Sequence, residues 1–313
     1  MKFTRPTRPG ASLLIILLLF PFFFLAGPSY HSPRSLLALW NLGHLLFFLA
    51  LVLFLASRRQ EKKLTWSWSL TILLLATGLG LVIELIQGQI DGRVASLPDL
   101  ARNSGGAILG LFLLAWPQQI RQRPALALGA GAIIVTSLLP VAAALVDEYR
   151  ARRDFPLLSS FESSLELSRW EGDGQIERVK SPVSAGEYAL AIRLTTAKYS
   201  GLNLHHFPRD WREMATLRLT INNQQATPME ITSRIHDMEH AIGEQPYHDR
   251  YNRRWTLEPG WNEISIDLAR VAAAPAGRRM DMAHIRGLGL FVSRQEQERR
   301  VVIDEVRLLG EVN

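Results

Sequence analysis

Long apolar runs fill the first half of the sequence, and they constrain its fold more than any other feature. The runs cover residues 11–27, 35–56, 66–88, 97–116 and 126–146. A helix of roughly 20 residues crosses the hydrocarbon core of a bilayer, so each run is about long enough to span a membrane. We therefore predict that residues 1–146 form an all-α membrane domain with five transmembrane helices.

The first run also fits a second interpretation. Lys2, Arg5 and Arg8 precede it, and a basic start followed by a short apolar region is typical of a cleaved signal peptide. A cut after Ala26 would place the large Phe24 close to the cleavage site, where signal peptidase favours small residues. We therefore favour a retained span.

The basic residues between the runs predict the orientation of the helices. Loops rich in Lys and Arg stay in the cytoplasm. One side of the membrane would carry Lys2, Arg5, Arg8, Arg58, Arg59, Lys62, Lys63, Arg121 and Arg123, and the other side Arg34, Arg93, Arg150, Arg152 and Arg153. The first side is more basic, so the sequence predicts a multi-pass inner-membrane protein with a cytoplasmic N-terminus and a periplasmic C-terminal domain.

The composition excludes several classes of function. The chain has 313 residues, no cysteine and a formal net charge of +6. Without cysteine there is no disulfide, thiolate metal site or cysteine nucleophile. Basic flanks of transmembrane helices account for positive charge of this kind, so we expect no nucleic-acid partner and instead expect contact with membrane lipid.

Polar residues interrupt the third and fourth runs near their predicted outer ends. Those of the third run lie three residues apart, and those of the fourth recur at i, i+4, i+7 and i+11, so each set shares one helix face. The sets are Glu84 with Gln87, and Asp99 with Asn103, Gly106 and Gly110. Arg93, in the short connection, could pair with Glu84 or Asp99 or bind an anionic headgroup.

This pattern, E-x-x-Q, an arginine, then S-x-x-D-x-x-x-N-x-x-G-x-x-x-G, resembles the VanZ-like family over roughly residues 11–146. The matching residues are Glu84, Gln87, Arg93, Ser96, Asp99, Asn103, Gly106 and Gly110. His44 is similar to the histidine that the family carries in its second span, but the Asp-Lys pair expected before it is replaced by Trp40-Asn41-Leu42-Gly43. The resemblance implies low-level glycopeptide resistance, as to teicoplanin, and envelope functions, but no defined reaction.

Three interpretations of this membrane polar site stay open. The polar residues could pair only with one another, since Ser96 and Asp99 fit a helix N-terminus and Gly106-x-x-x-Gly110 is typical of close helix packing. They could instead bind a ligand or lipid headgroup. They could also be catalytic, with Glu84 or His44 as general base and Arg93 as an anion clamp. The sequence shows no nucleophile or metal-ligand cluster, so whether the protein is an enzyme stays open.

The second half of the sequence has the short alternating runs of an antiparallel β-sandwich. Strands are expected at residues 187–194, 216–221, 229–235, 262–268, 287–292 and 301–308. We predict an all-β domain over residues 155–313, joined to the membrane domain by a linker at residues 147–154. Trp170, Trp211 and Trp261 are expected in its core.

The layout of this half, from Ser160-Phe161-Glu162 to the closing strand at residues 302–308, resembles jelly-roll galactose-binding-like modules that serve as carbohydrate-binding domains. Such modules often hold a structural calcium between their first and last strands. Glu162 and Asp304 supply the oxygen ligands that calcium prefers. No other cofactor is expected.

One segment of the β domain, residues 234–255, is dense in polar and aromatic side chains. Its candidate ligand-binding residues are His236, Asp237, His240, Tyr247, Asp249, Arg250, Tyr251, Asn252 and Trp255. Aromatic faces with planar polar groups hold sugars, although a solvated loop with internal salt bridges fits the same composition.

Together these features predict a VanZ-like inner-membrane protein that presents a carbohydrate-binding-like domain in the periplasm and binds or senses an envelope glycan or its lipid-linked precursor. A membrane enzyme acting on a lipid-linked phosphate is the second hypothesis. A non-catalytic scaffold for a protein partner is the third. The oligomeric state and the identity of the ligand stay open.

Overall fold

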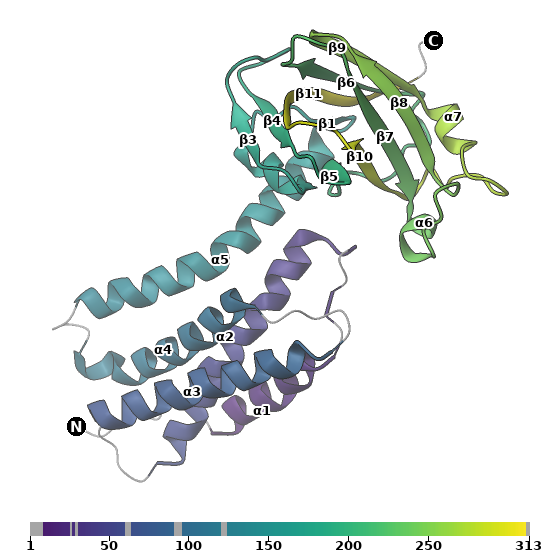
Figure 1. The fold of residues 1–313 in the computed structure, drawn as a ribbon. Coiled ribbons are helices and arrows are strands. Elements are labelled where there is room, and N and C mark those ends of the chain that lie inside the picture. Colours follow the sequence, from purple (N-terminus) through teal and green to yellow (C-terminus); the bar gives the residue numbers. More distant parts are fainter. Residues whose placement is uncertain are drawn as a thin grey trace. The chain divides into compact units, whose positions relative to one another are not determined.

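In the computed structural model, the chain divides into a helical unit, Met1–Leu145, and a β unit, Val146–Asn313 (Figure 1). The structure describes residues 9–25, 27–28, 31–59, 64–90, 96–119 and 124–310. The helices are α1 Pro9–Leu19, the 3-10 helix η1 Phe20–Phe23, α2 Arg34–Ser57, α3 Trp66–Gln87, α4 Leu97–Gln119 and α5 Pro124–Arg153. Each of the five predicted spans therefore contains a helix.

Three of these helices have the length and composition of a membrane span, namely α2, α3 and α5. The first run gives only a shorter apolar helix, because α1 ends before Pro21, which lacks a backbone N–H and sits in η1. The fourth, α4, carries Asp99, Arg102 and Asn103 near its start. The prediction of five transmembrane helices is thus supported for three, and the first and fourth spans remain predictions.

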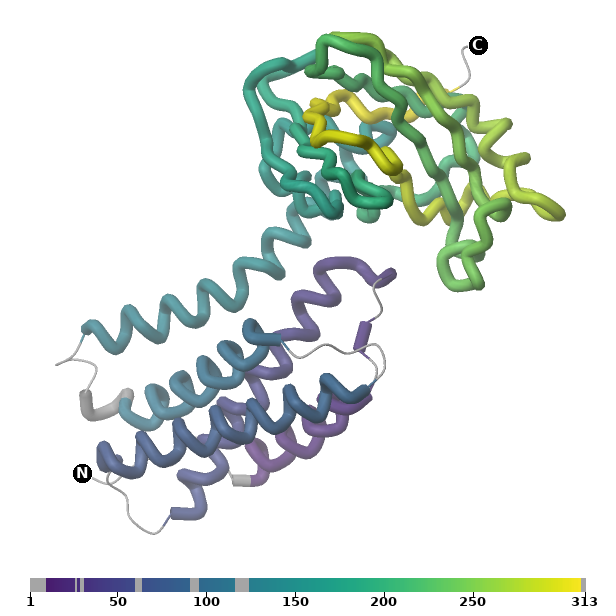
Figure 2. Tube along the Cα trace, viewed as in Figure 1, coloured from purple at the N-terminus to yellow at the C-terminus, as the bar shows by residue number. Residues whose placement is uncertain are grey.

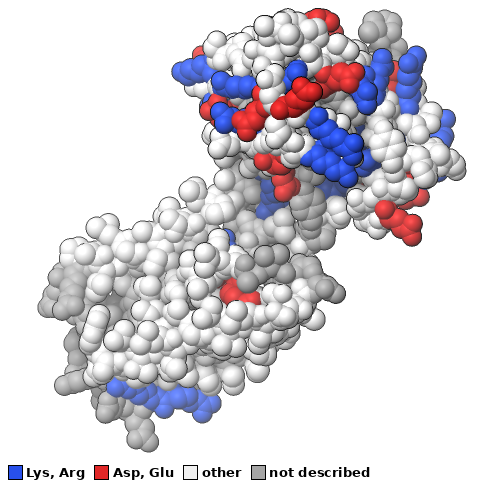
Figure 3. Space-filling model, viewed as in Figure 1, with Lys and Arg blue, Asp and Glu red and all other residues white. Residues whose placement is uncertain are grey.

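Helix α4 lies against both α2 and α3 in the helical unit. Glycine allows the close approach to α2, because a Cβ at Gly106 would overlap the backbone carbonyl of Leu45. Buried Phe48, Val52 and Ala107 fill the space beside this contact. In Figure 3 the flank of the unit is almost free of charge and Lys and Arg gather at one end, as expected of a membrane body.

The β unit is a sandwich of two antiparallel sheets, which confirms the predicted fold class. The strands are β1 Leu157–Ser159, β2 Trp170–Gly172, β3 Ile176–Val179, β4 Ala189–Leu194, β5 Tyr199–Leu204, β6 Thr216–Asn223, β7 Met229–Asp237, β8 Tyr251–Leu257, β9 Gly260–Asp267, β10 Ile285–Ser293 and β11 Arg299–Leu309. Short helices η2 Ser164–Arg169, α6 Met238–Ile242 and α7 Leu268–Ala272 connect them.

The first sheet has the order β3-β4-β11-β6-β9 with β1 beside β11, and the second has the order β2-β5-β10-β7-β8. The last two strands of the chain therefore lie inside the sheets rather than at their edges, as the yellow and yellow-green segments show in Figure 2. Alternation along β7 sends Met229, Ile231 and Ile235 into the core and leaves Thr232 and Arg234 on the outward face.

Two of the three predicted core tryptophans, Trp170 and Trp211, are buried, but the prediction for Trp261 is wrong. Trp261 is 38% exposed, because at the start of β9 the outward positions of the strand alternate with Ile264 and Ile266, which face the core.

The segment at residues 147–154, expected as a linker, contains the last turns of α5. The guanidinium of Arg169 donates from Nε to both carboxylate oxygens of Asp147, at 3.1 and 2.9 Å, and from Nη1 to the carbonyl of Leu158 at 2.7 Å. Both side chains are buried. The end of α5 is therefore part of the β unit's own fold, and any fragment of that unit has to include Asp147.

Candidate functional sites

Three helices of the helical unit bring polar side chains together around His44. This residue is buried in α2, and its Nδ1 lies 2.9 Å from Oδ1 of Asn103 on α4 and 3.9 Å from Oε1 of Glu84 on α3. Gly80 on α3 leaves the space for Asn103, since a Cβ there would overlap the asparagine side chain. We call His44, Glu84, Asp99 and Asn103 the membrane cluster.

Other predicted members of the site have different partners. Gln87 donates from Nε2 to the carbonyl of Phe23 at 2.8 Å, and the backbone N–H of Ser96 donates to Glu84 Oε2 at 2.8 Å. Asp99 forms an ion pair with Arg102, which was not among the predicted site residues although its i+3 spacing is typical of such a pair. Arg93 lies outside the described residues.

Three side chains of the membrane cluster lie close enough together to ligate one metal ion. His44, Glu84 and Asp99 each offer one ligand atom, and the three atoms lie within 4.8 Å of one another. An imidazole with two carboxylates suits zinc or manganese, and His44 with Glu84 could also transfer a proton. All three residues were predicted as parts of one polar site, but because each lies on a different helix their spacing gives no metal-ligand motif in the sequence.

An apolar pocket of about 310 Å³ opens beside His44 in the helical unit. Its lining comes from α1, η1 and α2, and includes Leu19, Phe22, Phe23, Leu39, Trp40 and Leu46. The ring of Phe23 stands edge-on to the His44 imidazole at 4.8 Å between centroids. A hydrocarbon chain is the kind of ligand that such a lining accepts, and its polar end would meet His44.

In the β unit, polar residues follow one row across the outward face of the five-stranded sheet. The strand register aligns Glu171, Asn203, Gly289, Arg234 and Asn252, from β2 to β8. Arg234 donates from Nη2 to Asn203 Oδ1 at 2.7 Å. Gly289 has no side chain to fill this space, and a Cβ there would meet both Asn203 and Arg234. We call this surface the sheet face.

His236 and Arg250 extend the sheet face at one end of β7. Ile235 pairs with Tyr251, so the next position on each chain places Arg250 opposite His236. Burial lowers the pKa of His236 to about 3, with further contributions from Arg234, His240 and Arg250, so its imidazole is neutral at pH 7. The guanidinium of Arg250 lies over the ring of Tyr247 at 5.4 Å.

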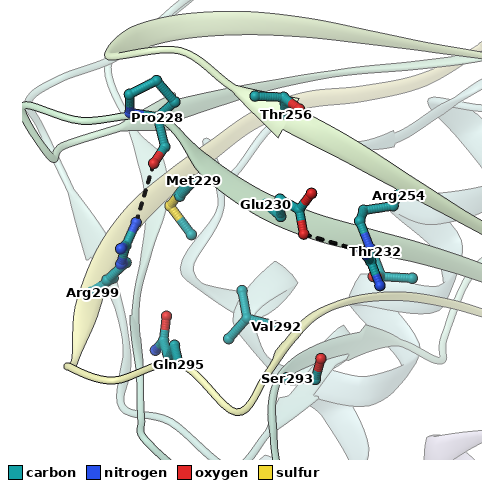
Figure 4. A pocket seen from close by; sticks show the side chains of 10 residues that line it. All are labelled: Pro228, Met229, Glu230, Thr232, Arg254, Thr256, Val292, Ser293, Gln295 and Arg299. Atoms are coloured by element: carbon teal, nitrogen blue, oxygen red, sulfur yellow. Dashed lines mark hydrogen bonds and ion pairs between the residues drawn. The ribbon is translucent and has the colours of Figure 1, made fainter.

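Aromatic side chains and a pocket complete the sheet face toward the other end of β7. Tyr199, 60% exposed, packs edge-on against Phe291 at 6.0 Å. Beyond them lies a pocket of about 360 Å³, whose lining includes Glu230, Thr232, Arg254, Ser293, Gln295 and Arg299. Figure 4 shows the ion pair between Glu230 and Arg254, 3.3 Å apart, at the side of this pocket.

The predicted binding segment, residues 234–255, is β7, α6 and β8 rather than one loop, and its residues divide between two faces. His236, Arg250 and Asn252 belong to the sheet face, with Tyr247 beside them. Tyr251 and Trp255 instead pack with the core. Tyr199, Asn203, Phe291 and Gly289 were missed, because they reach the site only through strand pairing.

Asp237 and Asp249 share a network of ion pairs with Arg278. Asp237 is wholly buried and caps α6 through the N–H of His240, while Arg278 lies 2.6 Å from both Asp237 and Asp249. Hydrogen bonds from Arg278 and backbone N–H groups hold the pKa of Asp237 at about 2, against the effect of burial. His240 pairs with Asp249 at 3.2 Å. These residues fix the position of the chain on either side of Arg250.

The predicted calcium ligands, Glu162 and Asp304, both accept hydrogen bonds from backbone N–H groups. Asp304 accepts hydrogen bonds from the N–H groups of Ser184, Ala185 and Glu305. Glu162 accepts from the N–H groups of Glu187 and Tyr188 at 2.9 and 3.1 Å. Both carboxylates therefore anchor the loop at residues 184–188, and a structural calcium held by them stays a prediction.

The two halves of the chain are similar to different known proteins. Residues 5–118 match the family VanZ-LLP1, described as VanZ/LLP1. No curated protein matches the chain.

Solved structures resemble the other half. A family 11 carbohydrate-binding module from Clostridium thermocellum, solved with a β-1,3-1,4-mixed-linked tetrasaccharide, shares 17% identity at a TM-score of 0.39 over 50% of this chain and 96% of its own. An exo-β-agarase shares 16% identity at a TM-score of 0.39, over 50% of this chain and 25% of its own. The C-terminal family 22 module of Clostridium thermocellum Xyn10B shares 12% identity at a TM-score of 0.35, over 48% and 90%. Residues 5–118 of the chain are therefore similar to the VanZ/LLP1 family.

Proposed function

We propose that the chain is a multi-pass inner-membrane protein whose β unit lies in the periplasm and binds an envelope glycan, or the glycan part of a lipid-linked precursor. The observation that carries this proposal is the sheet face. A row of planar polar side chains crosses all five strands over Gly289, beside the aromatic pair of Tyr199 and Phe291. Sugar-binding surfaces combine these two kinds of group.

The helical unit supports the membrane part of the proposal. Three of its helices are long and apolar enough to cross a bilayer, and basic residues predict which side is cytoplasmic. The apolar pocket beside His44 would hold the hydrocarbon chain of a lipid-linked ligand.

A glycan array probed with the full-length protein in detergent micelles tests the proposal. We expect retention of at least one envelope glycan, and about fivefold weaker binding in Tyr199→Ala, since an exposed aromatic platform contributes on the order of 1 kcal/mol. Trp261→Ala removes an exposed aromatic residue of the other sheet and should bind like the parent. Equal binding by both variants would place the site elsewhere. Absence of any retained glycan would contradict the function and favour the scaffold hypothesis.

A second candidate function is catalysis on a lipid-linked, phosphate-containing substrate at the membrane cluster. The proximity of His44, Glu84 and Asp99 favours it, because such a reaction needs proton transfer or a bound cation next to the phosphate. The apolar pocket reaches the same histidine.

The variant Glu84→Gln distinguishes a catalytic role of the Glu84 carboxylate from a purely structural one. The amide keeps an acceptor for the N–H of Ser96 but removes the charge, so we expect the protein to accumulate at its normal level and to lose function in glycopeptide- or envelope-stress-sensitivity assays. Asp154→Asn, which removes an exposed carboxylate of the β unit, is the matched control and should behave like the parent. Normal function of Glu84→Gln would rule out a role for the Glu84 charge. Loss of the protein itself would assign Glu84 to packing.

A further inference from the structure

Arg250 is a half-buried cation without a carboxylate partner in the described part of the chain. Its guanidinium lies over the ring of Tyr247, and among the described residues its buried Nε has no hydrogen-bond acceptor. Burial lowers the pKa of this guanidinium. By contrast, Arg278 lies between Asp237 and Asp249 at 2.6 Å from each. An arginine withdrawn from water usually pairs with an anion, so the surroundings of Arg250 lack one.

Other polar atoms near Arg250 are buried without a partner in the part of the chain that the structure describes. They are Nδ1 of His236 and Oδ1 of Asn252. Buried polar groups without a hydrogen-bond partner are uncommon in folded proteins. Three such groups close together indicate that a bound ligand supplies their missing partners. Nδ1 of a neutral imidazole can donate to an anion, and the asparagine oxygen can accept from a sugar hydroxyl.

The charge of the sheet face also indicates an anionic ligand. Two carboxylates of this face have a cationic or imidazole neighbour: Glu230 lies 3.3 Å from Arg254, and Glu171 lies 3.6 Å from His205. Arg234 and Arg250 add further positive charge to the face. In Figure 3, Lys and Arg side chains gather over the region of β7. A ligand that brings a negative charge to this end of the face would therefore complement it.

We propose that the glycan bound on the sheet face is acidic, and that its carboxylate or phosphate is held by Arg250 and His236 while Asn252 binds a neighbouring hydroxyl. The inference rests on the proposed function and adds the chemical class of the ligand. A guanidinium fork matches a carboxylate or a phosphate with two parallel hydrogen bonds. Tyr247, 68% exposed, would contact the sugar ring beside it.

Binding measurements on the full-length protein in detergent micelles test this inference with two probe pairs. A galacturonic acid trimer is compared with the neutral galactose trimer, and mannose 6-phosphate with mannose. We expect one acidic probe of the two to bind about tenfold or more tightly than its neutral parent, as charge-assisted hydrogen bonds permit. The better acidic probe identifies carboxylate or phosphate as the group recognised. Rising salt should weaken the acidic probe more than the neutral one.

Arg250→Gln should remove the advantage of the acidic probe over its neutral parent. Arg193→Gln removes the same charge from an exposed position of the other sheet, where Arg193 pairs with Glu298, and should keep the advantage. Equal, salt-independent binding of acidic and neutral probes by the parent protein would overturn this inference alone. Failure of every probe, together with an empty glycan array, would overturn the proposed function as well.

Discussion

Replacing Arg278 with methionine is expected to destabilise the β unit by about 3 kcal/mol, because it leaves Asp237 as a buried carboxylate without its cation. Asp237 is wholly buried, and Arg278 contacts it from two nitrogens, at 2.6 and 3.0 Å. Thermal unfolding of the full-length protein in detergent, followed by the far-ultraviolet β signal, measures the change. Arg193→Met, which removes one half of an exposed pair, should leave the midpoint unchanged.

The same replacement should alter the response of the β unit to acid. The folded-state pKa of Asp237 is about 2, below its ordinary value of 3.8, so its contribution is present above pH 3.8 and is lost as pH falls toward 2. Arg278→Met should remove much of this loss, and its unfolding midpoint should approach that of the parent in that pH range. A parent-like midpoint at pH 7 would mean that Arg278 is not the main partner of Asp237.

Arg278→Met should also weaken binding of the acidic glycan, because Arg278 holds the segment that carries Arg250. Asp237 ends β7 and caps α6, and Asp249 precedes Arg250 directly. Arg278 thus ties together the two ends of the segment that positions Arg250 beside His236. Asp237 and Asp249 thus share Arg278 as their cation, whereas Arg250 has no carboxylate partner among the described residues.

The sequence predicted the parts of this fold that depend on local pattern. Apolar runs of membrane length gave the positions of the helices, and alternation gave the strands, because both depend on which side of one element faces water or lipid. The same alternation would have separated Tyr251, in the core, from Asn252 on the sheet face. Treating residues 234–255 as a single loop hid that distinction.

The candidate sites depend on contacts between distant residues, which no local pattern contains. Asn203 meets Arg234 across 31 positions, and Arg278 meets Asp237 across 41. His44 meets Asn103 across 59. The polar stripes of α3 and α4 were visible from spacing, but the histidine that joins them came from a family resemblance. The remaining residues of the sheet face depend on strand order, since β10 brings Gly289 between Asn203 and Arg234.

Gly106 gives a direct test of how the membrane cluster is assembled. It lies one turn from Asn103 on α4, and the backbone of Leu45 that it meets is next to His44 on α2. Any side chain at residue 106 would therefore push α2 away from α4 at the point where His44 and Asn103 form their hydrogen bond. The contact involves backbone atoms, so no side-chain rotation can relieve it.

We expect Gly106→Ala to destabilise the helical unit by about 1–3 kcal/mol, the usual cost of overpacking, and to lower the amount of protein in the membrane. Gly78→Ala is the matched control, because no atom lies within 4 Å of a Cβ at that position. Thermal aggregation of the detergent-solubilised protein and membrane levels measure both. Equal behaviour of the two variants would contradict the close contact of α2 with α4. We expect Gly106→Ala to lower the protein level, and Glu84→Gln to keep the level normal but lose function. This difference would separate the packing of the membrane cluster from its chemistry.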